Sequence, residues 1–186
     1  TGEHEVFFKQ ERVGFKNSIF KIWKFATMLK NSPNMGHGDM TVRKDPRITP
    51  MGRFLRQSKI NELPQVINIL TGDMSFVGPR PLMKVGFDRY SDEMKSKVYN
   101  ARPGLTGIGS IVFRDEELII TQSKLPPQEC YRDVILPYKG ALEVWYQQHQ
   151  NFYTDFMILF LTAWYVVFPK SNLVYKTFPS LPERSF

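Results

Sequence analysis

The chain has 186 residues, 42% of them hydrophobic, so it can bury one core, and a single domain over residues 1–186 is the simplest expectation. Its net charge of +7 favours an acidic partner such as an anionic lipid or a phosphorylated substrate. The lone Cys130 excludes an internal disulfide, and the Cys and His residues lack zinc-like spacing. No helix-turn-helix and no strand motif of interleaved basic and aromatic residues accompanies the charge, so nucleic acid is not expected as a partner.

The first half of the chain predicts short strands followed by short helices. Val6–Phe8 and Ile19–Phe25 flank turn signals and are typical of two paired strands. A short basic helix is predicted over Met51–Leu55. The next helix is expected to begin near Asn61, with Pro64 in its first turn, where a missing N–H costs little. Its apolar residues share one helical face: Leu63, Val66, Ile67 and Leu70.

The second half predicts longer helices. Phe87–Asn100 is typical of a charged surface helix, and Gln128–Gln150 of a long helix with a possible break at Pro137. Phe156–Phe168 is apolar throughout, but its 13 residues are fewer than the roughly 18 that a membrane-spanning helix needs. It therefore predicts either a buried core helix or a helix at the membrane surface. The tail over residues 170–186 is expected to be loose.

Five motifs follow one another along the chain. They are Lys24-Phe25-Ala26-Thr27-Met28, Asp45-Pro46-Arg47-Ile48-Thr49, Asn61-Glu62-Leu63-Pro64-Gln65, Gly78-Pro79-Arg80-Pro81 and Arg102-Pro103-Gly104-Leu105-Thr106-Gly107. In this order and spacing they resemble the bacterial sugar transferase family, the monotopic phosphoglycosyl transferases, over residues 7–168. The resemblance implies a mixed α/β (α+β) fold, rich in helices with short strands, that forms a compact membrane-associated catalytic domain. It also implies a re-entrant N-terminal membrane helix, which we expect to precede Thr1.

The resemblance implies a reaction as well. A member of this family would transfer a sugar-1-phosphate from a UDP-sugar to polyprenyl (undecaprenyl) phosphate and release UMP. The transfer would start exopolysaccharide, capsule or glycan assembly at the cytoplasmic face of the bacterial inner membrane. Mg²⁺ is the expected cofactor, because a divalent ion neutralises the charge that develops on the leaving UMP.

The implied catalytic residues are Asn61, Glu62 and Lys24. In the family an Asp-Glu pair stands at positions 61 and 62; the Asp carboxylate attacks the β-phosphate, and the Glu supports the metal or positions the phosphates. Here Asn61 replaces the Asp, and a neutral carboxamide is a poor nucleophile. Glu62 is thus the expected metal ligand, and Lys24 matches a lysine that the family keeps near its active site.

Four outcomes stay open for the missing carboxylate. Glu62 attacks in its place, or the prenyl phosphate attacks directly without a covalent stage. Alternatively another carboxylate serves, or the chain is a catalytically impaired protein that binds nucleotide-sugar or lipid phosphate. The other candidate carboxylates are Asp45, Asp73, Asp115 and Glu143. The simplest structural role of Asn61 is that of a helix N-cap.

Phosphate-bearing substrates need fixed cations, and arginine can bind phosphate through two parallel hydrogen bonds. Arg80 lies between Pro79 and Pro81, which predicts a stiff extended mount for its side chain. The resemblance assigns Arg80 to the prenyl phosphate and Glu143 to the nucleotide-sugar. The arginines expected to bind substrate phosphates are Arg56, Arg80, Arg102 and Arg114.

Overall fold

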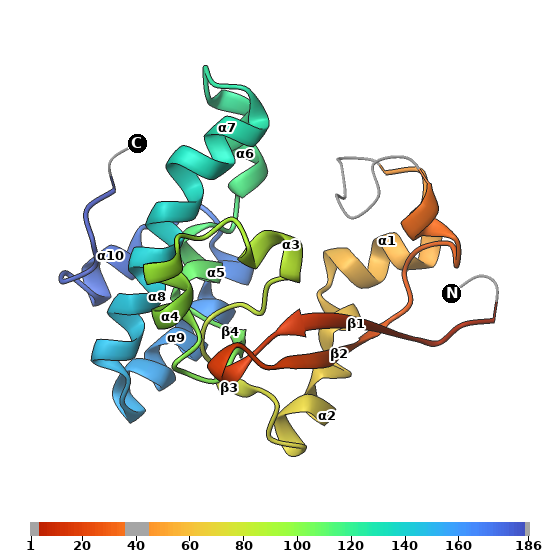
Figure 1. The fold of residues 1–186 in the computed structure, drawn as a ribbon, viewed down its shortest axis with the longest axis horizontal. Coiled ribbons are helices and arrows are strands. Elements are labelled where there is room, and N and C mark those ends of the chain that lie inside the picture. Colours follow the sequence, from red (N-terminus) through yellow and green to blue (C-terminus); the bar gives the residue numbers. More distant parts are fainter. Residues whose placement is uncertain (1–3, 36–44, 185–186) are drawn as a thin grey trace. The chain divides into compact units, whose positions relative to one another are not determined.

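The computed structural model describes residues 4–35 and 45–184, which form two compact units (Figure 1). Unit 1 comprises Thr1–Glu11 and Lys21–Gly72, and unit 2 comprises Arg12–Phe20 and Asp73–Phe186. Short strands and many helices confirm the predicted mixed α/β class. Among the described residues, no helix combines the length and the apolar character needed to cross a membrane.

Unit 1 is built on two paired strands and two short helices. Strand β1 (Phe7–Val13) pairs with β2 (Ile19–Phe25) as expected, although β1 extends beyond the predicted Val6–Phe8. The end of β1, the turn and the start of β2 (Arg12–Phe20) belong to unit 2. Helix α1 (Pro50–Gln57) follows an isolated antiparallel bridge between Met28 and Ile48. The 3-10 turn η3 (Ile60–Glu62) then leads to α2 (Gln65–Leu70). A further 3-10 turn, η2 (Ser32–Asn34), lies in the preceding loop.

Helix α1 packs closely on the segment that follows β2. The Thr49 side chain caps the helix by accepting a hydrogen bond from the Gly52 N–H at 2.9 Å, and Pro50 occupies its first turn. Gly52 has no room for a side chain, because a Cβ there would lie 2.0 Å from the Thr27 carbonyl oxygen. This close approach fixes α1 against Thr27.

Unit 2 holds the larger core. Strands β3 (Ser75–Val77) and β4 (Gly104–Thr106) form a parallel pair, with Ser75 opposite Gly104 and Val77 opposite Thr106. The helices of this unit are α3 (Lys84–Phe87), α4 (Asp92–Val98), α5 (Ile108–Val112), α6 (Glu116–Gln122), α7 (Pro127–Cys130), α8 (Leu136–His149), α9 (Phe152–Val167) and α10 (Leu173–Thr177). A 3-10 turn, η1 (Phe15–Asn17), and a π-helical turn, η4 (Tyr131–Ile135), complete it.

Helices α8 and α9 form the centre of this core. Ile158 and Leu161 of α9 and Leu142 of α8 are fully buried in one apolar cluster. A hydrogen bond of 2.8 Å joins the hydroxyls of Thr162 and Thr106, so α9 is tied to the strand β4. The opposite face of α9 is exposed and apolar. The helix is therefore neither a fully buried core helix nor a helix that lies only at a surface, which were the two expectations. Its exposed large apolar residues are Phe152, Tyr153, Phe156, Leu159, Phe160, Val166 and Val167.

Three expectations for the second half need correction. The helix predicted over Phe87–Asn100 is shorter than expected: Phe87 is the last residue of α3, and α4 covers only Asp92–Val98, because Ser91 begins this helix by accepting a hydrogen bond from the Met94 N–H. Pro137 does not break the long helix, since it lies in the first turn of α8 after the π-helical turn η4. The tail is not loose over residues 173–181, because Val174, Phe178 and Leu181 are buried in the core of unit 2. The single-domain expectation stays a prediction.

Candidate functional site

The central feature of unit 1 is an ion pair at the Asn-Glu motif. Lys24 lies near the end of β2 and Glu62 ends η3, and Lys24 Nζ is 3.3 Å from Glu62 Oε1. The exposed fractions of the two side chains are 17% and 16%, so the pair is largely withdrawn from water yet still reachable. Screening by water is reduced at such a site, which strengthens the interaction between the two charges. The structure thus brings together two of the three predicted catalytic residues.

Two local features place this pair. Lys59 adopts φ 61°, ψ 6°, a left-handed conformation that reverses the chain directly before η3. Asn68 of α2 is buried and binds the edge of β2, donating to the Lys21 carbonyl and accepting from the Trp23 N–H, both at 2.9 Å. The carboxamide of Asn68 therefore ties the motif-bearing segment to the strand that carries Lys24.

Asn61 is not the helix cap that the sequence suggests. It lies inside η3, whose N-cap is Lys59, whereas Pro64 precedes α2 and no side chain caps that helix. The Asn61 side chain is buried, and its Oδ1 atom has no hydrogen-bond partner. Leaving a buried acceptor unpaired costs about 1–3 kcal/mol. An unpaired oxygen beside Glu62 is a group that a bound ligand or cation could satisfy.

The residues of the Asn61-Glu62 motif could hold Mg²⁺ only together with substrate phosphates and water. Among the described residues no cluster of three or more His, Cys, Asp or Glu could hold a metal ion. However, Mg²⁺ in nucleotide sites commonly uses one or two carboxylates and completes its coordination with substrate phosphates and water. Glu62 and the unpaired Asn61 Oδ1 supply oxygen ligands of that kind. The Glu62 metal role stays a prediction.

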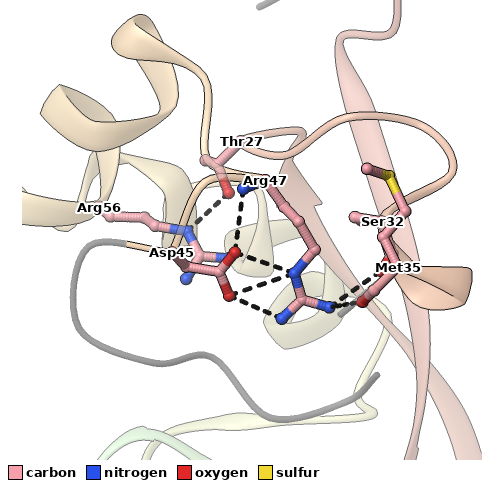
Figure 2. A network of polar contacts seen from close by, with 6 residues as sticks. All are labelled: Thr27, Ser32, Met35, Asp45, Arg47 and Arg56. Atoms are coloured by element: carbon pink, nitrogen blue, oxygen red, sulfur yellow. Dashed lines mark hydrogen bonds and ion pairs between the residues drawn. The ribbon is translucent and has the colours of Figure 1, made fainter. Parts of the chain in front are cut away.

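Arg56 of α1 is held in a fixed direction by Thr27. Its Nε donates to the Thr27 hydroxyl at 2.8 Å, and the Thr27 side chain is buried (Figure 2). Burial lowers the pKa of Arg56, an effect that the nearby Asp45 carboxylate opposes. A half-buried guanidinium held through Nε can still present its terminal nitrogens to a phosphate.

Beside Arg56 lies a buried ion pair whose role is structural. Arg47 donates from Nε to Asp45 Oδ1 at 2.9 Å and from Nη2 to Asp45 Oδ2 at 2.7 Å (Figure 2). Its Nη1 also donates to the carbonyls of Ser32 and Met35, both at 2.9 Å. Arg47 thus holds the loop after β2 in place. Since both Asp45 oxygens accept from Arg47 and the side chain is buried, Asp45 cannot approach a substrate phosphorus as a nucleophile.

The remaining predicted residues lie in unit 2. The side chains of Arg80, Arg102 and Arg114 are exposed, as a binder of a diffusing phosphate must be. Asp73 and Asp115 are also exposed. Glu143 of α8, in contrast, is buried, and its pKa is raised to about 7 by desolvation, against a hydrogen bond from the Arg80 backbone and the charge of Lys139. A side chain so buried is better suited to position its neighbours than to contact a nucleotide-sugar.

Sequence reasoning missed several residues of these sites. Asn68 and Tyr99 lie in none of the five motifs, and Thr27 lies in the first motif without any sign of a positioning role. Their partners are up to 47 positions away along the chain. For Asn68 a weak signal exists, because it is a polar residue between the apolar Ile67 and Ile69. Nothing comparable identifies Tyr99.

The chain is similar in sequence to a family of known proteins. A family model described as bacterial sugar transferase matches residues 1–169. The chain is 32% identical over 167 residues to an undecaprenyl-phosphate galactose phosphotransferase of Salmonella typhimurium, covering 82% of this chain and 31% of that protein. It is 34% identical over 161 residues to a UDP-glucose:undecaprenyl-phosphate glucose-1-phosphate transferase of Escherichia coli, covering 85% and 32%. An uncharacterized sugar transferase of Bacillus subtilis is 35% identical over 158 residues, covering 85% and 68%.

Proposed function

This chain belongs to the bacterial sugar transferase family, and on that premise we propose that it transfers a sugar-1-phosphate from a UDP-sugar to undecaprenyl phosphate with release of UMP. The names of its relatives support this class of donor and acceptor, although the chain spans only about a third of the length of two of them. Those two names specify different sugars, galactose and glucose, so they leave the sugar open.

The observation that carries the proposal is the Lys24–Glu62 pair. It places a carboxylate and an ammonium 3.3 Å apart, largely out of water, at the position of the family's catalytic motif. Transfer requires that the phosphorus attached to the sugar gain one oxygen ligand and lose the bridge to UMP. Lys24 is suited to offset the negative charge of the diphosphate, and Arg56 supplies a second cation from α1.

Two routes are compatible with Asn61. In the first, a Glu62 oxygen attacks the sugar-bearing phosphorus and UMP leaves with the bridging oxygen. A prenyl phosphate oxygen then attacks the same phosphorus, which restores the carboxylate. In the second, a prenyl phosphate oxygen attacks the sugar-bearing phosphorus directly, and UMP leaves with the bridging oxygen. Glu62 would hold Mg²⁺ in this route, and the ion would neutralise charge on UMP. Intact-mass measurement after incubation with UDP-sugar alone separates the routes, because only the first gives a sugar-phosphate adduct on the protein.

We assign the acceptor phosphate to Arg80 and further phosphate contacts to Arg102 and Arg114, all exposed in unit 2. The reaction would take place at the cytoplasmic face of the bacterial inner membrane. An exposed apolar face on α9 supports contact with lipid, since contiguous apolar surface of that kind marks interaction sites.

The proposal is tested by UMP release from a panel of UDP-sugars, with undecaprenyl phosphate in detergent or lipid nanodiscs and with Mg²⁺. Release that requires both substrates supports the transferase. A second function, binding of nucleotide-sugar or lipid phosphate without turnover, is favoured by the carboxamide of Asn61 in place of a carboxylate. Substrate binding without UMP release for any sugar of the panel would establish that alternative.

A further inference from the structure

The irregular segment that carries Arg80, between β3 and α3, is held in place by two buried side chains. Tyr99, at the end of α4, donates from its hydroxyl to the Arg80 carbonyl at 2.9 Å. The same hydroxyl accepts from the Leu82 N–H at 2.8 Å. Glu143 of α8 accepts a hydrogen bond from the Arg80 backbone N–H. Both polar backbone groups of Arg80 are therefore bound by side chains rather than by a strand or helix.

These contacts leave the Arg80 side chain directed outward. Pro79 and Pro81 are buried on either side of it, whereas Arg80 itself is exposed. The neighbouring backbone is also paired, because the Pro79 carbonyl accepts from the Gly104 N–H at 2.9 Å. The Leu82 carbonyl likewise accepts from the Val13 N–H at 2.9 Å. The exposed guanidinium of Arg80 thus belongs to a segment in which almost every polar backbone atom is hydrogen-bonded.

Glu143 is an unusual choice for a purely structural acceptor. Its Oε2 atom is buried and has no hydrogen-bond partner, and a Cβ on Gly109 would lie 2.6 Å from its Oε1 atom. Burying a carboxyl group costs more free energy of folding than burying an amide of the same shape. The contact with the Arg80 backbone gives this carboxyl group a role that offsets the cost.

We infer that Tyr99 and Glu143 are positioning residues for Arg80, which fix its backbone so that its guanidinium meets a prenyl monophosphate already in the binding orientation. The inference rests on the proposed role of Arg80 in binding the acceptor phosphate. An arginine on a mobile loop must be ordered when it binds, whereas one on a fixed backbone segment avoids most of that entropy cost. The two proline rings restrict the same segment from the outside.

A double-mutant cycle tests this inference. The measured quantity is the affinity for a short-chain, water-soluble prenyl monophosphate, determined by titration calorimetry, so no turnover is needed. Tyr99→Phe removes the hydroxyl, and Glu143→Met removes the acceptor at similar volume. Each should weaken binding about five- to tenfold, the effect of losing one buried hydrogen bond. In an Arg80→Ala background neither should weaken it further, because the residue through which they act is gone.

Conservative variants separate positioning from general stability. Glu143→Gln keeps an acceptor oxygen for the Arg80 N–H and should bind within about twofold of the unaltered chain. Tyr138→Phe is the matched control for Tyr99→Phe, because the buried Tyr138 hydroxyl also donates to a backbone carbonyl, that of Pro182. It should leave the affinity unchanged. If Tyr99→Phe fails to fold, Glu143→Met against Glu143→Gln carries the test alone.

Three results would overturn the inference. Equal losses in the presence and absence of the Arg80 side chain would show that Tyr99 and Glu143 support only the fold. A Glu143→Gln variant as weak as Glu143→Met would show that the acceptor is not what matters. Unchanged affinity in Arg80→Ala would remove both the phosphate role of Arg80 and the inference. A coupled cycle in a chain that releases no UMP would instead leave the inference standing and reject only the transferase.

Discussion

Lys24 Nζ and Glu62 Oε1 lie 3.3 Å apart although 38 positions separate the two residues along the chain. A β-strand contributes the ammonium and a 3-10 turn contributes the carboxylate. The pair is formed by packing within unit 1, with Asn68 joining the same strand to the helix that follows the motif. Both charges are less hydrated than they would be on an open surface, so each is stabilised by the other.

Glu62→Gln should lower UMP release by at least about 100-fold, because it removes the charge that attacks or holds the metal while keeping the size of the side chain. The rate of UMP formation with UDP-sugar and undecaprenyl phosphate measures this. Glu93→Gln is the matched control, since Glu93 pairs with Lys97 on the exposed face of α4 and should be neutral. Robust turnover in Glu62→Gln would locate the chemistry elsewhere.

Asn61→Asp should raise turnover, because it restores a carboxylate at the position where the family has its nucleophile. Intact-mass spectrometry should then detect a sugar-phosphate adduct after incubation with UDP-sugar alone. Asn61→Ala should not lower the free energy of unfolding by more than about 1 kcal/mol, since the Oδ1 atom it removes has no hydrogen-bond partner to lose.

The control for Asn61→Asp is Asn100→Asp, the same change at an exposed position, which should not alter turnover. If Asn61→Asp still binds nucleotide-sugar but gives neither adduct nor UMP, the binding protein becomes the better explanation of this chain.

Arg47→Met should destabilise the chain by about 3–5 kcal/mol, because it leaves the buried Asp45 carboxylate without its partner. Denaturant unfolding followed by fluorescence measures the loss. Lys84→Met breaks an exposed pair with Asp88 and should cost less than about 1 kcal/mol. Similar losses in the two variants would mean that the Arg47–Asp45 pair is no more important for stability than a surface pair.

The sequence was sufficient for the strand pairing and for the position of α1, because these depend on local patterns. Strand β2 covers Ile19–Phe25 as predicted, and α1 (Pro50–Gln57) contains the predicted Met51–Leu55. The catalytic roles of Glu62 and Lys24 stay predictions. The expected cap at Asn61 is wrong, since the left-handed Lys59 starts a 3-10 turn one residue earlier and draws Asn61 inside. A backbone reversal at a non-glycine residue leaves no clear signal in a single sequence.

The tail shows a second limit of the sequence. Its prolines and polar residues indicate a loose segment, yet Phe178 packs edge-on against the Trp145 ring at 5.3 Å between centroids. Contacts of this kind join residues distant along the chain, so no local pattern predicts them. The same holds for Tyr99 and Glu143, whose shared partner Arg80 becomes evident only from the fold.

Glu143 should make the stability of the chain fall as the pH rises from about 4.5 to about 7. Desolvation raises its pKa from 4.5 to about 7, so between these values the folded chain holds a proton that the unfolded chain has lost. The stabilisation is fully present below about pH 4.5 and is lost as the pH rises through 7. The shift corresponds to about 3 kcal/mol.

Denaturant midpoints between pH 4.5 and 8 measure this dependence. Glu143→Gln should flatten the curve over that window, while Glu129→Gln, the same change at an exposed position, should leave it as it is. Glu143 acts electrostatically on Tyr90, Tyr99 and Tyr146, but burial raises the pKa of each of these tyrosines, so they stay neutral across this window. An unaltered slope in Glu143→Gln would assign the pH dependence to another group.

The exposed face of α9 should bind lipid. Phe156 and Phe160 are 58% and 44% exposed, one helical turn apart, whereas Ile158 and Leu161 anchor the opposite face in the core. Changing both Phe156 and Phe160 to Ser should lower partitioning onto anionic phospholipid vesicles at least about tenfold, because each buried aromatic ring contributes about 1.5–3 kcal/mol. Co-sedimentation measures the partitioning, and the melting temperature should stay nearly constant because both rings are largely exposed.

Val85→Ser, at an exposed apolar position on α3, is the control and should bind vesicles normally. Unchanged binding in the double variant would show that α9 does not contact the membrane through this face.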